Sequence, residues 1–84
     1  MDRAKYIMFD NGLMQVPIIF PIVIGHSEMG RNFPNWNVVS AGFVQWTKDG
    51  IFAFGDSITL KVKSRPEDTT YMRKYLNLAP NDFS

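Results

Sequence analysis

Two Asx-Gly steps, Asn11-Gly12 and Asp49-Gly50, each stand between short segments rich in β-branched and aromatic residues. Asn, Asp and Gly tolerate the positive φ of tight turns, so this pattern is the strongest short-range signal for a β-hairpin. The first step predicts pairing of a strand at 5–9 with one inside 13–24. The second predicts pairing of 38–47 with 51–54. Antiparallel strands are therefore expected to dominate the fold.

Prolines and glycines predict how these strands end. Pro17 and Pro21 place the second strand at a sheet edge, because proline has no N–H to give to a central ladder. The step Gly55-Asp56 interrupts the apolar run, after which residues 57–63 alternate strictly between apolar and polar side chains. This alternation predicts a long strand that passes through a bulge or bend at the glycine.

Two helices are expected. Ser27 predicts the cap of a short helix of one or two turns that ends near Gly30. The sequence Ser64-Arg65-Pro66-Glu67 matches a capping box with Ser64 as the N-cap. Apolar residues then recur at helical spacing until Ala79-Pro80-Asn81, namely Tyr71, Met72, Tyr75, Leu76 and Leu78. The predicted fold class is α+β, a mostly antiparallel sheet of four or five strands with one C-terminal amphipathic helix and one short helix.

Length and composition exclude several classes of protein. Eighty-four residues predict a single small domain spanning 1–84. A net charge of +1 gives no overall field toward a polyanion or an anionic membrane, so no membrane partner is expected. With no cysteine and one histidine, neither a metal site nor a cofactor is predicted. The charged start and short apolar run do not resemble a secretory signal, which favours a cytoplasmic location.

One motif resembles an enzyme block. The letters FGDSIT at 54–59 resemble the first block of the GDSL hydrolases, in which the serine, here Ser57, is the nucleophile. The downstream Asp-x-x-His pair of that family is absent, and His26 is upstream. A serine nucleophile needs a base and an orienting group within reach. We therefore expect no enzymatic activity, and expect Ser57 to bond local backbone or Asp56 instead.

Two groups of residues are candidate binding sites. Phe33 and Trp36 lie in a loop rich in Asn, Pro and Gly, so they either plug the core or act as exposed contact anchors, two alternatives that the sequence leaves open. The polar residues that would accompany such an anchor are Arg31, Asn35 and Asn37.

The second group is the basic row Lys61, Lys63 and Arg65. It is either a solvated strand face that discourages edge pairing or a phosphate-binding row. The functional reading is a homo-oligomer that sequesters a phosphorylated small molecule or nucleotide signal. A weak nucleic-acid-binding module is a third hypothesis, although Phe43 and Trp46 fall in a strand that reads as core.

Four stretches together resemble a group of small uncharacterised phage and prophage proteins: VPIIFP (16–21), HSEMGR (26–31), VVSAGFV (38–44) and SITLKVKSRPED (57–68). The resemblance implies a context, because small accessory phage proteins often bind and block a host factor, including components of CRISPR and other antiphage systems. The leading hypothesis is thus a non-enzymatic accessory protein that inhibits a host or defence protein in the bacterial cytoplasm.

Overall fold

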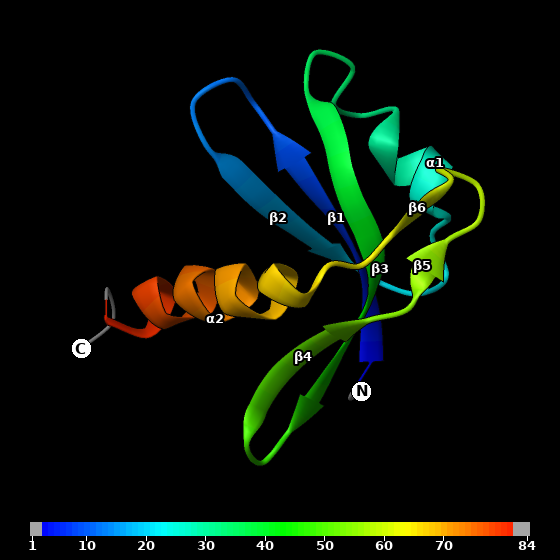
Figure 1. The fold of residues 1–84 in the computed structure, drawn as a ribbon. Helices are drawn as coiled ribbons and strands as arrows, with labels where there is room; N and C mark the ends of the chain where they lie inside the picture. The colour runs from blue at the N-terminus through cyan, green and yellow to red at the C-terminus, as the bar shows by residue number, and fades with distance from the viewer. Residues whose placement is uncertain (1–2, 82–84) are drawn as a thin grey trace.

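The computed structural model describes residues 3–81 and forms an α+β domain, as predicted (Figure 1). A four-stranded antiparallel sheet has the order β2-β1-β3-β4, and β5 and β6 form a separate two-stranded sheet. The elements in chain order are β1 (Arg3–Asp10), β2 (Gln15–Phe20), α1 (His26–Gly30), β3 (Asn37–Thr47), β4 (Gly50–Phe54), β5 (Asp56–Ser57), β6 (Val62–Lys63) and α2 (Pro66–Asn81). No helix in the described part of the chain is long and apolar enough to cross a membrane.

Both predicted hairpins are confirmed. Asp10 pairs with Gln15 across the first loop, where Gly12 has a φ of 96° and its N–H donates to Asp10 Oδ1 at 2.8 Å. In the second hairpin Thr47 pairs with Gly50, whose φ is 125°. The β2 strand lies at the sheet edge and ends directly before Pro21, as its prolines predict.

The predicted strand over 57–63 is wrong. Only the two-residue strands β5 and β6 form, and the residues between them turn, with a φ of 60° at Lys61. The Ser57 hydroxyl accepts the Leu60 N–H at 3.2 Å, which stabilises the turn against the extended backbone. Ile58, an apolar residue of the alternating segment, is 85% exposed. Gly55, with a φ of 78°, takes the chain out of β4 before this turn.

Hydrophobic clusters lie on both faces of the sheet, because neighbouring residues of β1 point to opposite sides. On one face Tyr6 and Met8 pack with Val44 and with Met72 of α2. On the other face Ile7 and Phe9 pack with residues of α1, of the loop that follows it and of the β5–β6 turn. We call this second side the outer face of the sheet.

In both helices the N-cap is a different residue from the one predicted. Helix α2 begins at Pro66, which makes Arg65 the N-cap, and Asp68 rather than Glu67 accepts the cap N–H at 3.0 Å. Asp68 takes this role because it stands three residues after Arg65, the position from which a side chain reaches back to the N-cap N–H. Helix α1 is capped at Gly25, whose N–H donates to Glu28, so Ser27 is not its cap.

The apolar stripe predicted for α2 is only partly buried. Met72 is fully buried and Leu76 packs against the same cluster, whereas Tyr71 and Tyr75 are 37% and 49% exposed. The side chain of Leu78 lies outside the described residues.

Candidate binding surface

A buried polar cluster joins α2 to the sheet. Asp68 Oδ2 accepts hydrogen bonds from the Tyr6 hydroxyl at 2.5 Å and from the Ser40 hydroxyl at 2.6 Å. Asp68 Oδ1 accepts from Arg65 Nε at 3.0 Å and lies 2.8 Å from Arg65 Nη2. All three of Tyr6, Ser40 and Asp68 are shielded from solvent. The carboxylate is therefore fully satisfied, which is the condition for keeping a charge inside a protein.

The protonation states of this cluster follow from its contacts. Burial raises the pKa of Asp68, but hydrogen bonds from Ser40, Tyr6 and Arg65 outweigh burial and place the pKa below its ordinary value. Burial, and then the hydrogen bond to Asp68 and its charge, raise the pKa of Tyr6 well above its ordinary value. Asp68 is thus ionised and Tyr6 neutral near pH 7, so the cluster holds the fold together and is closed to ligands.

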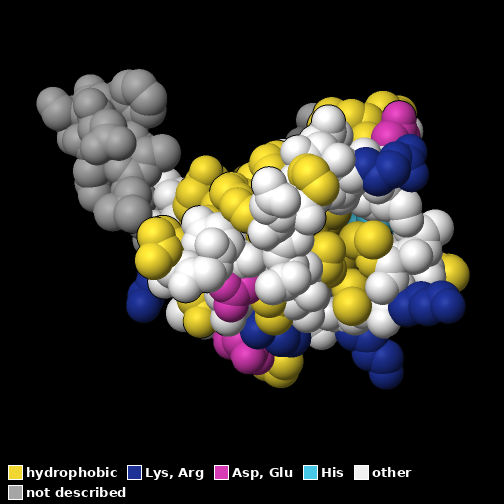
Figure 2. Space-filling view, turned by 90° about the horizontal axis from the view of Figure 1, so that it is seen from above, with side chains coloured by type: hydrophobic (Ala, Val, Ile, Leu, Met, Phe, Trp, Pro, Cys, Tyr) yellow, Lys and Arg dark blue, Asp and Glu magenta, His cyan; other side chains and the backbone are white. Residues whose placement is uncertain are grey.

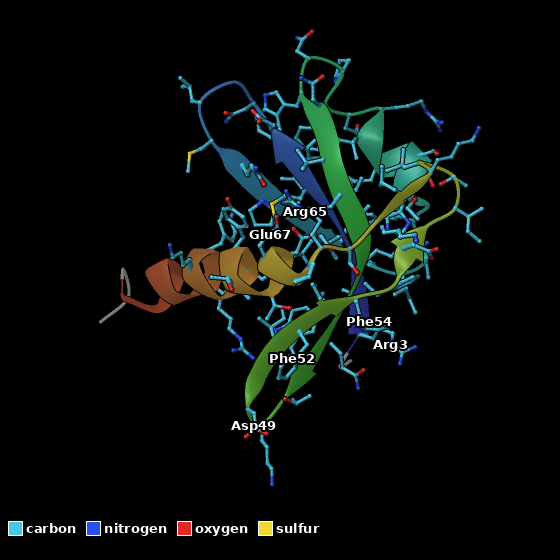
Figure 3. The ribbon with its side chains drawn as sticks, viewed as in Figure 1. Arg3, Asp49, Phe52, Phe54, Arg65 and Glu67 are labelled. Atoms are coloured by element: carbon cyan, nitrogen blue, oxygen red, sulfur yellow. The ribbon has the colours of Figure 1, made fainter. Side chains whose placement is uncertain are left out.

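This cluster removes Arg65 from the predicted basic row. The Arg65 guanidinium faces Asp68 and donates to Gln15 Oε1 at 2.6 Å, which ties the N-terminus of α2 to β2. Lys61 lies in the β5–β6 turn and Lys63 on β6, both exposed. The predicted row on one strand does not form, because Arg65 points to a buried carboxylate. Figure 3 shows Arg65 and Glu67 at the start of α2.

The aromatic loop after α1 folds back onto the core. Phe33 and Trp36 are half-buried, and their rings lie 5.0 and 5.7 Å from the ring of Phe9. They also stack on each other at 5.1 Å. The structure therefore favours the core-plug alternative for both residues. Their polar companions remain exposed: Arg31, Asn35 and Asn37, the last being the first residue of β3.

Ser57 and His26, the two residues that a hydrolase-like site would need, bond to different partners. Ser57 is buried and its hydroxyl serves the β5–β6 turn, while His26 Nε2 lies 2.8 Å from the Gly42 carbonyl. Burial lowers the pKa of His26 below its ordinary value, although the bond to Gly42 opposes the shift. Among the described residues there is no hydrogen bond between His26 and Ser57, and no cluster of potential metal ligands.

A part of the outer face remains open at the β4 end of the sheet. The strand register places six side chains there in two rows of three, one from each of β1, β3 and β4. The two rows are Arg3, Gln45 and Phe52, and Lys5, Phe43 and Phe54. We call these six residues the open face. Arg3, Phe52 and Phe54 are exposed, and the other three are half-buried.

Arginines flank the two exposed phenylalanines of the open face. The Arg3 guanidinium lies 5.4 Å from the centre of the Phe54 ring, and that of Arg73, from α2, lies 4.7 Å from the Phe52 ring. Both distances fall within the range of cation–π attraction. Phe54 also stacks on Phe43 at 5.9 Å. Figure 3 shows Phe52 and Phe54 on β4, with Arg3 beside Phe54. These contacts hold two large apolar side chains in place while they stay in contact with water.

Exposed hydrophobic side chains also occur elsewhere, and Met14, Pro17, Tyr71 and Tyr75 line one hollow between β2 and α2. Seen from above, hydrophobic side chains form several small groups among polar atoms, and Lys and Arg side chains project at the periphery (Figure 2). Single exposed apolar side chains of this kind are normal on soluble proteins. One further guanidinium, that of Arg65, lies 5.9 Å from the Tyr71 ring. The open face has two such contacts on neighbouring phenylalanines of one strand, and this makes it the candidate binding surface.

Comparison of the chain with protein-family models, curated proteins and solved structures gives no match. The open face was not among the binding sites predicted from the sequence, although the sequence contains a signal for it. Phe52 and Phe54 are two positions apart on a predicted strand and so share a face, and the Asp49-Gly50 hairpin places Phe43 opposite Phe54.

Proposed function

We propose that this protein acts by binding another protein, and that the open face is its contact surface. The observation that carries the proposal is the pair Phe52 and Phe54, exposed on one strand and each flanked by an arginine. Aromatic and arginine side chains dominate the binding energy of protein interfaces. The strand that carries them is paired with β3, so little backbone entropy is lost when they bind.

Such a surface is suited to steric inhibition, in which the protein covers a functional surface of its target. A small domain can block a larger protein by occupying the surface that its substrate or partner needs. The resemblance to phage and prophage proteins supports a host or antiphage-defence protein as the target, CRISPR effectors included. The site of action would then be the cytoplasm of the bacterial host.

The phosphate-binding alternative has lost its geometric support, because Arg65 is paired with Asp68. The loop residues Phe33 and Trp36 are also poor probes of binding. They pack on Phe9, so their truncation would disturb the core as well as any contact.

The test is affinity capture from bacterial lysate with the double variant Phe52→Ser, Phe54→Ser. The matched control is Leu13→Ser, Met14→Ser in the β1–β2 loop, where the side chains are 94% and 63% exposed. Folding of each variant is checked by circular dichroism and urea unfolding. We expect the wild type and the loop control to capture the same partner, and the open-face variant to lose it. A folded open-face variant that keeps the partner would refute the proposal.

A cellular assay addresses the inhibitory role separately. The protein is expressed in bacteria that carry a defined defence system, and phage plating is measured. We expect restored plating with the wild type and the loop control but not with the open-face variant. Unchanged plating across a panel of CRISPR and other systems would contradict the anti-defence role.

A further inference from the structure

We propose that the partner presents an acidic surface, with apolar side chains between its carboxylates, to the open face. The inference rests on the proposed function and specifies the partner's chemistry. Its basis is the set of cations at this surface. Arg3 and Lys5 belong to the open face, and Arg73 reaches the Phe52 ring from α2. None of the six open-face residues is acidic.

These three cations are held by neutral groups. Lys5 Nζ donates to the Ile24 carbonyl at 2.9 Å, and Arg73 Nε donates to the Ile51 carbonyl at 3.2 Å. Arg3 lies against the Phe54 ring. The salt bridges among the described residues both belong to Arg65, at the start of α2. Two carboxylates lie nearby, since Asp56 of β5 lines a cavity with Lys5 and Phe43, and Asp49 lines another with Arg73. Neither belongs to the open face, and neither forms a salt bridge among the described residues. The positive charge at the open face is thus not neutralised within its own rows.

The cost of removing the arginines from water indicates which chemistry a partner needs. A partner that covers Phe52 and Phe54 also removes the adjacent guanidinium groups from water, and a buried charge without a counter-charge is strongly unfavourable. Carboxylates placed opposite Arg3 and Arg73 remove that cost and form charge-assisted hydrogen bonds. Apolar side chains between these carboxylates would cover the two phenyl rings.

A nucleic acid could supply negative charge too, but it binds such platforms by stacking bases on free ring faces. Here a guanidinium already lies over each exposed ring, at 4.7 and 5.4 Å, and Phe54 also stacks on Phe43. Phe54 is thus contacted by both a guanidinium and a second ring, and Phe52 has a guanidinium on one face, which leaves at most one face of Phe52 for a base. Side chains of a protein can instead contact the ring edges and the arginines together.

The inference is tested by fluorescence anisotropy with three labelled probes. The probes are a short peptide that alternates Asp with Leu and Phe, the same peptide with Lys in place of Asp, and a single-stranded oligo-dT. We expect the wild type to prefer the acidic peptide over the basic one by about tenfold or more, and the affinity to fall as salt rises. Oligo-dT should bind more weakly than the acidic peptide.

Variants locate the effect. Arg3→Gln should weaken binding of the acidic peptide by about tenfold, as expected for loss of one charged contact in an interface. Lys48→Gln, at the exposed tip of the β3–β4 hairpin, should leave it unchanged. Equal binding of both peptides, no binding of the acidic one, no effect of Arg3→Gln, or tighter binding of oligo-dT would each overturn the inference. If lysate capture still depends on Phe52 and Phe54 in that case, the proposed function stands and only the acidic partner is excluded.

Discussion

Replacing Asp68 with Asn should destabilise the protein more than any conservative surface change. The carboxylate accepts hydrogen bonds from Tyr6, Ser40 and Arg65, and a guanidinium lies 2.8 Å away. An amide of the same size keeps one acceptor oxygen and puts a donor where the other oxygen was. With the amide oxygen in the place of Oδ2, the Tyr6 and Ser40 hydroxyls keep their acceptor. The amide donor then faces the Arg65 guanidinium, which loses both its acceptor and its counter-charge.

Breaking a buried charge pair in this way costs about 3–5 kcal/mol. A chain of 84 residues has a total stability of about 4–13 kcal/mol. Asp68→Asn should therefore remove a large share of the free energy of unfolding, measured by urea denaturation at pH 7. Glu67→Gln is the matched control, because this side chain is 56% exposed and lies 3.6 Å from Arg65. Exposed pairs of this kind contribute about 0–1 kcal/mol.

The same variant has a defined pH dependence. Since folding lowers the pKa of Asp68, the stability that its carboxylate contributes is present above the unfolded pKa and is lost as the pH falls through the folded pKa. The difference between wild type and Asp68→Asn should thus shrink in acid, below about pH 4. A cost at pH 7 no larger than that of Glu67→Gln, or a difference that grows in acid, would refute the assignment of Asp68 as the charge that holds α2 to the sheet.

Three further predictions follow from other contacts. Gly42→Ala should lower the free energy of unfolding by about 1–3 kcal/mol in urea denaturation, because the added Cβ would lie 2.4 Å from the Phe54 carbonyl oxygen. Gly30→Ala is the control, since the nearest atoms to its Cβ are 3.9 Å away and the change should be tolerated. Because folding lowers the pKa of His26, the wild type should lose stability as the pH falls below about 6.5, and His26→Gln should flatten this dependence in urea midpoints taken across that range. Ser57→Ala should cost about 1–3 kcal/mol through the unpaired Leu60 N–H, and neither it nor the wild type should hydrolyse an activated ester above buffer. Hydrolysis that disappears in this variant would contradict a purely structural role for the hydroxyl.

Turn chemistry made much of this fold predictable. Asn11-Gly12 and Asp49-Gly50 act locally, so the two hairpins and the edge position of β2 follow from a few neighbouring residues. The alternation over 57–63 gave a wrong prediction of a strand, because local hydrogen bonds also decide whether the backbone stays extended. A period of two describes a strand only if the backbone stays extended, and the Ser57 hydroxyl together with the positive φ of Lys61 closes a turn instead.

The buried cluster could not be predicted from local pattern. Asp68 bonds Tyr6, which is 62 residues away, and Ser40, which is 28 residues away. Sequence periodicity carries no information about such distant pairs. Once Asp68 is drawn into the core, it displaces Glu67 as the capping residue and turns Arg65 inward. The error in the cap and the loss of the predicted basic row therefore have one physical cause.

The backbone of β4 limits how a partner can use the open face. An unpaired sheet edge usually offers N–H and C=O groups to an added strand. Here the Ala53 N–H donates to the Thr69 hydroxyl at 3.0 Å, and the Ile51 carbonyl accepts from Arg73 at 3.2 Å, so side chains of α2 occupy two of the outward groups of this edge. A partner on the open face is therefore expected to bind through side chains and not by strand addition at β4. Removing Phe52 and Phe54 should accordingly abolish most of the binding, because α2 interrupts the backbone ladder that β4 could otherwise offer.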